Sequence, residues 1–270
     1  MTMHVARGLD ALVPGDYPAF VVVGVFDGLH LGHAYLLRHL ATEAARHGAR
    51  PMVVTFDHHP DEIIIGAAPP LLCDPVERLV LLEAAGVGTT VVVHFDQALR
   101  ETTYDAFVDR LATHGSLAGF LMTPDAAFGF QRGGTPQALA ALGRDRGFEV
   151  VVVPPFELDG RAVRSTEVRA AIASGDLRTA ERLLGRRHAV AGMATPAGGP
   201  QGAVALAFEL PVMLPPDGVW MATVDEGDGA TPSTVTVSEG RLLVPAAAAG
   251  RWTRVCFESG DGTPGVVPTG

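Results

Sequence analysis

The sequence predicts an α/β fold, a Rossmann-like parallel sheet with helices on both faces, followed by a small C-terminal β-barrel-like domain. Over the first two-thirds of the chain, short apolar β-rich segments alternate with helical patterns. Glycines follow those helical patterns, as expected for helix C-caps. Further on, clusters of Pro, Gly and Asp separate short β-rich segments, which is typical of a small β-domain.

The predicted sheet strands are nearly all apolar, which suits strands that are buried on both faces. They are Phe20–Val25, Met52–Phe56, Thr90–Phe95, Gly119–Met122 and Val150–Val153. The helices expected between them are Ala34–His47, Pro75–Ala85, Tyr104–His114 and Thr135–Arg146. Because ligands in such folds bind at the carboxyl ends of the strands, the loops that follow the strands are the expected site.

Two more helices are expected after the last strand, one capped by Ser165 or Thr166 and one capped by Asp176. The Gly- and Pro-rich segment 194–202 is predicted to be a linker or loop. The β-domain strands are then expected at Ala203–Leu210, Val219–Val224, Ser233–Val237, Arg241–Val244 and Thr253–Phe257. We expect two domains, residues 1–187 and residues 188–270.

The composition excludes several functions. A formal net charge of -10 argues against binding to nucleic acid or to an anionic membrane surface. The sequence contains no Lys, which excludes a lysyl-adenylate, a Schiff base and a Walker lysine. Cys73 and Cys256 lie far apart in no metal-binding spacing, so we expect reduced thiols. No metal-ligating residues are predicted. Neither a signal peptide nor a membrane-length apolar stretch is visible, so a cytoplasmic location is expected.

The most informative segment follows the first expected strand and opens the first helix. It reads Gly24-Val25-Phe26-Asp27-Gly28-Leu29-His30-Leu31-Gly32-His33. Its first two glycines let the backbone approach a nucleotide closely, while Phe26 and Asp27 shape the loop. His30 and His33 share one face of a helix start, where two imidazoles can stabilise charge at an α-phosphorus. The alternatives are a structural histidine pair and a metal site, which more often uses i,i+4 histidines.

A second anion site is expected where the first of the two later helices begins. The hydroxyls of Ser165 and Thr166, together with the free N–H groups of a helix N-terminus, can bind phosphate oxygens. Arg169, one turn further on, can reach the same phosphates with a forked guanidinium. The alternative is an ordinary helix cap followed by a solvated arginine, and the pairing with the first motif favours the anion site.

These segments resemble a known family. Gly24–His33 is similar to the Gly-x-Phe-Asp-Gly-x-His-x-Gly-His signature of the nucleotidylyltransferase superfamily, with Val25 where Asn is common. Val163–Arg169 resembles the superfamily's Ser-Ser-Thr-x-Ile-Arg signature, with Arg164 in place of the first Ser. The order of the motifs and the ending Leu183-Leu184-Gly185-Arg186 narrow the resemblance to the bacterial FAD synthetases, the bifunctional riboflavin kinase/FMN adenylyltransferases, over about residues 18–192.

Two further motifs of that family lie on the acceptor side. His59 and Pro60 match its Thr-Phe-x-x-His-Pro pattern. The loop 123–134 matches a family loop that forms the flavin side of the pocket at Asp125 and Phe128. That loop departs from the family at Thr123, Ala126 and Ala127, which removes an aromatic side chain and an arginine.

The resemblance implies adenylyl transfer from ATP, accompanied by Mg²⁺, to FMN, giving FAD and pyrophosphate. His30, His33 and Arg169 are then the catalytic residues. The implied ATP-binding residues are Gly24, Phe26, Asp27, Gly28, His30, His33, Ser165, Thr166 and Arg169. The implied flavin-binding residues are His59, Pro60, Asp125 and Phe128. The partners expected are small molecules, and the oligomeric state is not predicted.

The C-terminal third departs further from the family. Its riboflavin kinase barrel carries a Gly-Phe-Pro-Thr-Ala-Asn signature, but no Thr-Ala-Asn follows Pro211 here. We therefore expect a degenerate barrel without riboflavin kinase activity. Two alternatives stay open for the whole chain: nucleotidyl transfer to another phosphorylated acceptor, prompted by the altered loop, and a non-catalytic flavin-nucleotide-binding protein, prompted by the altered barrel.

Overall fold

A computed structural model of the 270-residue chain describes residues 2–13, 17–197, 204–245 and 247–259. The described residues form two compact units. The first consists of the residues up to Phe26, Gly32–Pro69 and Leu79–Glu157, and the second of Asp27–Leu31, Pro70–Arg78 and the residues from Leu158 onward. The domain limits expected from the sequence, 1–187 and 188–270, stay a prediction.

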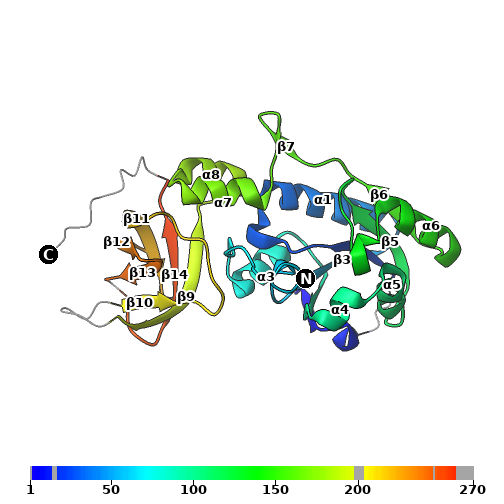
Figure 1. Cartoon of the computed structure of the whole chain (residues 1–270), viewed down its shortest axis with the longest axis horizontal. Coiled ribbons are helices and arrows are strands. Elements are labelled where there is room, and N and C mark those ends of the chain that lie inside the picture. Colours follow the sequence, from blue (N-terminus) through cyan, green and yellow to red (C-terminus); the bar gives the residue numbers. More distant parts are fainter. Residues whose placement is uncertain (1, 14–16, 198–203, 246, 260–270) are drawn as a thin grey trace. The chain divides into compact units, whose positions relative to one another are not determined.

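The first unit is built on a six-stranded parallel sheet, which confirms the predicted fold class (Figure 1). Its strands are β1 (His4–Arg7), β2 (Ala19–Val23), β3 (Arg50–Phe56), β4 (Thr89–Val93), β5 (Leu117–Met122) and β6 (Glu149–Val152). They lie in the order β1-β4-β3-β2-β5-β6, and every neighbouring pair is parallel. The edge strand β1 was not predicted, because its four residues form no apolar run.

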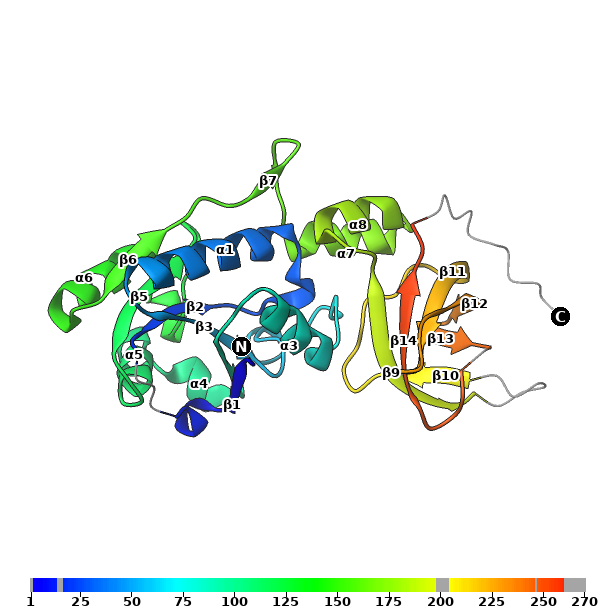
Figure 2. The same cartoon turned by 180° about the vertical axis from the view of Figure 1, so that it is seen from behind.

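Helices cover both faces of this sheet. The helices of the described chain are α1 (Leu31–Arg46), α2 (Asp61–Ile64), α3 (Pro75–Ala84), α4 (Gln97–Glu101), α5 (Tyr104–Ala112), α6 (Pro136–Arg146), α7 (Ser165–Ala173) and α8 (Leu177–Leu184). Phe107 of α5 and Leu139 of α6 share a core with Val21 of the central strand β2. The next residue toward the N-terminus, Phe20, points to the opposite face, where its ring lies 5.3 Å from that of His47 after α1. Both views show α1 and α5 on opposite sides of the sheet (Figures 1 and 2).

The second unit contains a closed antiparallel barrel, as expected from the C-terminal sequence. Its strands are β9 (Ala189–Pro196), β10 (Val204–Ala207), β11 (Gly218–Asp225), β12 (Thr231–Ser238), β13 (Arg241–Val244) and β14 (Trp252–Phe257). Its core is shared with α7 and α8, since Ile172 and Leu184 pack in one cluster with Trp220 and Phe257. A two-stranded hairpin, β7 (Glu157–Leu158) and β8 (Arg161–Ala162), precedes α7.

The structure corrects two local predictions. The linker expected at 194–202 is wrong at its start, because β9 continues to Pro196 and pairs with β10; residues 198–202 lie outside the described residues. The cap expected at Ser165 or Thr166 is also wrong, because Arg164 occupies the N-cap position and makes no side-chain cap bond. The Asp176 cap is confirmed, since its carboxylate accepts from the Thr179 N–H at 2.9 Å. None of the described helices has the length and apolar character needed to span a membrane.

Candidate active site

The loop after β2 contains a buried charged pair. Asp27 is 3% exposed, and one of its carboxylate oxygens accepts from the Leu72 N–H at 2.8 Å. The other oxygen accepts from the guanidinium of Arg169, which also donates through Nε to the Pro70 carbonyl at 2.8 Å. Burial raises the pKa of the Asp27 carboxyl, and the neighbouring Arg169 charge opposes that rise. The predicted ATP-binding residues Asp27 and Arg169 are therefore in direct contact in this structure.

A second arginine binds the backbone of the same loop. Arg186 donates to the carbonyl oxygens of Gly28 at 2.8 Å and of Leu29 at 3.4 Å. In the sequence, Arg186 stood out only as the last residue of the Leu183-Leu184-Gly185-Arg186 ending, and no role at the loop was predicted for it. Its two hydrogen bonds go to backbone carbonyls that are 157 and 158 residues away in the sequence. No local sequence pattern predicts such a contact.

Gly28 is required here for packing as well as for conformation. Its φ of +73° lies in the region that favours glycine, and an added Cβ would lie 2.7 Å from the Leu72 Cβ. In this structure its close neighbour is therefore Leu72, whereas the sequence analysis assigned the loop glycines to close approach of a nucleotide. Gly24 differs, because it lines the cavity described below.

His30 lies in the buried part of this loop and is 4% exposed. Burial and the nearby positive charges of Arg186 and Arg169 lower the pKa of its imidazole to about 4. The ring is therefore neutral near pH 7 and can donate only one hydrogen bond. His33 lies in the first turn of α1, in the first unit, where its ring is 5.1 Å from the ring of buried Phe26.

The start of α7 supplies the hydroxyls predicted from the sequence. Ser165 Oγ donates to the Asp27 carbonyl oxygen at 3.4 Å, so this residue joins the group formed by Asp27 and Arg169. Thr166 is exposed, and its hydroxyl donates to the Glu167 carboxylate at 2.9 Å. Ser165 and Arg169 thus both contact Asp27. The hydroxyl of Thr166 instead contacts its neighbour on the same helix, Glu167.

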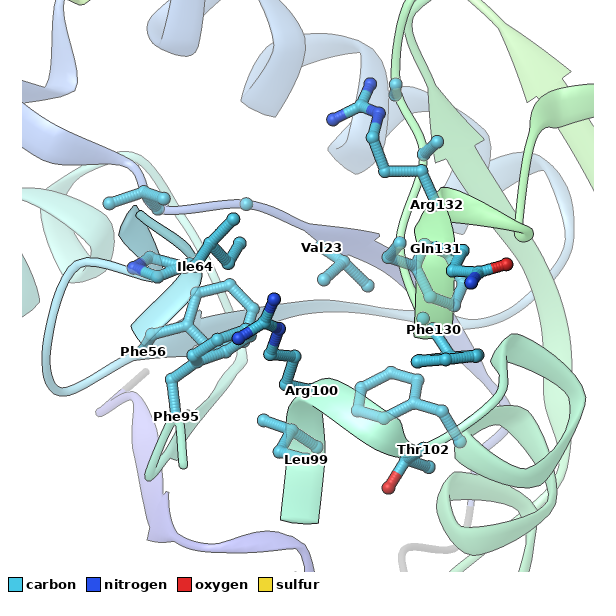
Figure 3. A pocket seen from close by; sticks show the side chains of 18 of the residues that line it. Val23, Phe56, Ile64, Phe95, Leu99, Arg100, Thr102, Phe130, Gln131 and Arg132 are labelled. Atoms are coloured by element: carbon cyan, nitrogen blue, oxygen red, sulfur yellow. The ribbon is translucent and has the colours of Figure 1, made fainter. Parts of the chain in front are cut away.

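A separate feature of the first unit is a cavity of about 740 Å³ at the carboxyl ends of β2, β3, β4 and β5 (Figure 3). Six aromatic rings line it, from Phe56, Phe95, Phe107, Phe120, Phe128 and Phe130. The predicted acceptor residues His59, Pro60 and Phe128 are among the lining residues, whereas Asp125 is not. A cavity of this size and apolar character is typical of sites for small organic ligands.

His59 and Asp125 are held in different ways. His59 Nδ1 accepts from the Asp61 N–H at 3.2 Å, which leaves its Nε2–H as the donor. Asp125 is exposed, and one carboxylate oxygen accepts from the Thr123 hydroxyl at 2.8 Å, as in an ordinary turn. Its neighbours Ala126 and Ala127 line the cavity instead.

Two arginines that the sequence analysis did not assign to the site also line the cavity. Arg100 comes from α4, and its guanidinium donates to the Ile63 carbonyl at 3.1 Å; Figure 3 shows it between Phe95 and Phe130. Arg132 donates to the Asp125 carbonyl at 2.9 Å. Arg100 lies in a five-residue helix outside every motif, so no sequence pattern indicated it.

The fold is that of an α/β protein with a cavity at the carboxyl edge of its parallel sheet. Residues 14–167 match the FAD synthetase family, and the chain belongs to that family. It is 35% identical over 191 residues to the bifunctional riboflavin kinase/FMN adenylyltransferase of Pseudomonas fluorescens, covering 70% of this chain and 61% of that protein. With the protein of the same description from Haemophilus influenzae it shares 34% identity over 192 residues, 70% of this chain and 62% of the relative.

These matches span less than two thirds of the length of the two relatives. Among solved structures, the crystal structure of a macrolide-efflux protein from Streptococcus pneumoniae is similar in fold, with a TM-score of 0.76 and 21% identity. That similarity covers 95% of this chain and 89% of the other. At this level of identity it is evidence for the fold alone.

Proposed function

We propose that the protein transfers an adenylyl group from ATP to FMN and so forms FAD and pyrophosphate. The observation that carries this proposal is the aromatic cavity at the carboxyl edge of the sheet, which includes Gly24 of the loop, in a member of the FAD synthetase family. The cavity falls in the range of roughly 300–1,000 Å³ that is usual for small-molecule sites. Its aromatic walls suit stacking against a flavin ring.

In the proposed reaction an oxygen of the FMN phosphate attacks the α-phosphorus of ATP. The bond from that phosphorus to the oxygen shared with the β-phosphate breaks, and pyrophosphate leaves with the electron pair. No covalent intermediate with the protein is needed, so the chain supplies position and electrostatic stabilisation. His30 and His33 donate hydrogen bonds to the reacting phosphates. The neutral state of His30 fits a hydrogen-bond donor rather than a cation.

Ser165, Thr166 and Arg169 complete the proposed triphosphate site. Binding would draw the Arg169 guanidinium partly from Asp27 to the β- and γ-phosphates, because both anions compete for it. Mg²⁺ shields the triphosphate and enters with ATP as part of the substrate. We assign it no protein ligand at Asp27, since both oxygens of that carboxylate already accept hydrogen bonds.

On the acceptor side we propose that the flavin ring occupies the cavity and that His59, Pro60 and Phe128 form part of its walls. Asp125 acts by holding the loop after β5 rather than by lining the cavity. Compared with the family, this loop lacks an aromatic ring at 126–127 and an arginine; we propose that Phe130, further along the same loop, and Arg100 of α4 take their places. Both line the same cavity, which supports FMN as the acceptor despite the altered loop.

We also propose that the barrel has no riboflavin kinase activity. The segment where the Thr-Ala-Asn signature would stand is bound in a backbone bridge: the Leu71 N–H donates to the Pro211 carbonyl at 2.8 Å, and the Met213 N–H donates to the Leu71 carbonyl at 2.8 Å. Backbone groups paired in this way are unavailable to a second nucleotide. A cytoplasmic location remains part of the same proposal.

The direct test incubates the pure protein with ATP, Mg²⁺ and either FMN or riboflavin and then separates the flavins. We expect FAD from FMN and no product from riboflavin. The His30→Ala/His33→Ala protein, shown to be folded by circular dichroism, should lose at least 100-fold in rate, as for removal of transition-state donors elsewhere. A wild-type rate in that variant would rule out this site.

The two alternatives give different results in the same assay. Pyrophosphate release with another phosphorylated acceptor, but not with FMN, would identify a different nucleotidyl transfer. Tight FAD binding without turnover would identify a non-catalytic flavin-nucleotide-binding protein.

A further inference from the structure

Three potential metal ligands meet at the ends of β3 and β4, in the first unit. The two strands are parallel and pair Phe56 with Val93, so the next residues, Asp57 and His94, lie side by side. The Asp57 N–H donates to the Val93 carbonyl at 3.1 Å and continues the ladder by one bond. His58 follows Asp57 directly. The strand register therefore fixes which side chains converge here.

The ligand atoms of these three side chains are close enough to share one ion. His94 Nδ1 lies 2.6 Å from one Asp57 carboxylate oxygen, and His58 Nδ1 lies 3.3 Å from the other. One ligand atom from each residue falls within 4.8 Å of the other two. Ions bound at about 2.0–2.2 Å from each ligand place the ligands roughly 3–3.5 Å apart. The exposed His94 side chain can make the small rotation needed, since its exposed fraction is 66%.

The carboxylate is held in place by its own surroundings. One Asp57 oxygen accepts from the backbone N–H groups of His58 at 2.7 Å and of Phe95 at 3.3 Å. Such bonds orient a ligating carboxylate before the ion arrives. The other oxygen faces His94. A bound ion would replace the proton that this oxygen and His94 share and would keep open positions for water.

We propose that Asp57, His58 and His94 form a site for a divalent transition-metal ion such as Zn²⁺ or Ni²⁺. Two imidazole nitrogens and one carboxylate suit these borderline ions, whereas Mg²⁺ prefers oxygen ligands alone. The site is thus chemically distinct from the Mg²⁺ that accompanies ATP. This inference does not depend on the proposed function.

The site lies beside the acceptor cavity without forming its wall. Phe56 and Phe95, the chain neighbours of Asp57 and His94, line the cavity, but the three ligands do not. The ion and a flavin can therefore bind together. We expect the affinity for Ni²⁺ to change by less than threefold when FMN is added.

The test is titration calorimetry of the full-length, untagged chain with NiCl₂ and with ZnCl₂. We expect one ion per chain, and His94→Ala and Asp57→Asn should each weaken binding at least tenfold. With Co²⁺ as the probe, visible absorption bands should form and should be lost in His58→Ala. Binding of Ni²⁺ should persist in a thousandfold excess of Mg²⁺ over Ni²⁺.

His47→Ala is the matched control. His47 contacts two carboxylates, of Glu149 at 3.1 Å and Glu43 at 4.0 Å, but no second imidazole is placed with them among the described residues. Its substitution should leave the stoichiometry and the affinity unchanged. Equal loss in His47→Ala and His94→Ala, unchanged binding in His94→Ala, or displacement by Mg²⁺ would each overturn the proposal. Circular dichroism of every variant separates loss of the site from loss of the fold.

Discussion

The loops after β2 and β5 both follow strands at the carboxyl edge of the sheet, but different interactions stabilise them. In the first loop Asp27 and His30 are buried, and the guanidinium groups of Arg169 and Arg186 bind its carboxylate and its carbonyls. In the second loop Phe130 is 42% exposed, and hydrogen bonds such as that from Arg132 to the Asp125 carbonyl hold the turn.

This difference explains where the sequence departs from its family. Buried charges tolerate few substitutions, because removing one partner leaves the other unpaired in a poorly solvated place. Uncharged, half-buried side chains in a turn can change at a smaller cost in folding free energy. The first loop accordingly keeps its motif residues except at Val25, whereas Thr123, Ala126 and Ala127 of the second loop all differ from the family pattern.

The largest effect is expected from Arg169→Met. It leaves the Asp27 carboxylate without its buried partner, and we expect the free energy of unfolding to fall by about 3–5 kcal/mol. The measurement is urea unfolding followed by circular dichroism. The double variant Asp27→Asn/Arg169→Met should regain a large part of the loss, because no unpaired charge remains.

Arg182→Met is the control for that experiment. Arg182 forms an ion pair with Asp159, but both side chains are more than half exposed. Its loss should cost less than about 1 kcal/mol. If Arg169→Met proves as mild as Arg182→Met, the first loop is not held by its charges and the contrast between the loops is wrong.

Gly28→Ala should give the next largest effect. The new Cβ would have to sit 2.7 Å from the Leu72 Cβ at a φ of +73°, so both overpacking and backbone strain act. We expect the unfolding free energy to fall by about 2–5 kcal/mol, the sum of about 1–3 kcal/mol for overpacking and about 1–2 kcal/mol for the left-handed conformation.

Gly147→Ala separates these two causes. Gly147 ends α6 with a φ of +80°, but an added Cβ there meets nothing within 4 Å. It should therefore show the conformational cost alone, about 1–2 kcal/mol. Equal losses in the two variants would mean that Leu72 moves aside and that the first loop is less tightly packed than the structure indicates.

The two loops also show what sequence reasoning can reach. The motif residues of the first loop could be recognised because they form one continuous segment of the sequence. The apolar strands predicted that this loop lies at the sheet edge. The anchors Arg186 and Arg100 were missed, since each bonds to a backbone carbonyl that any residue type could provide. Strand β9 was missed because Ala, Gly and Thr dominate it, and its pairing with β10 and β14, rather than β propensity, makes it a strand.

Acid should weaken the first loop through His30. The pKa of His30 is about 4 in the folded chain and near 6.5 when unfolded, so protonation favours the unfolded state. Stability is complete above pH 6.5, falls as the pH drops from 6.5 to 4, and levels off below that. At pH 5 the loss is about 2 kcal/mol. Urea unfolding at pH 7 and pH 5 measures it.

The His30→Asn variant isolates this contribution, because buried His188, whose pKa is also lowered to about 4, adds a loss of the same sign in both proteins. The stability difference between pH 7 and pH 5 should be about 2 kcal/mol smaller in His30→Asn than in the wild type. An unchanged difference would show that His30 is solvated or that its ring becomes charged without cost.

The smallest effect is expected at Arg100, which lies on α4 and lines the cavity together with residues of the second loop. If its guanidinium replaces the arginine that the loop after β5 lacks, Arg100→Ala should raise KM for FMN about tenfold, equivalent to about 1.4 kcal/mol. KM for ATP and kcat should stay unchanged, because a residue that only binds the acceptor acts equally on ground and transition states. Steady-state FAD formation measures all three.

Two variants sharpen this result. Arg110→Ala is the control, because Arg110 lies on α5 beside Asp10 and does not line the cavity. Ala127→Arg placed in the Arg100→Ala background restores an arginine to the loop and should recover part of the lost FMN affinity. A fall in kcat at constant KM would instead assign Arg100 to the reacting phosphates. No change at all would mean that its bond to the Ile63 carbonyl is only structural, and that the exposed loop alone selects the acceptor.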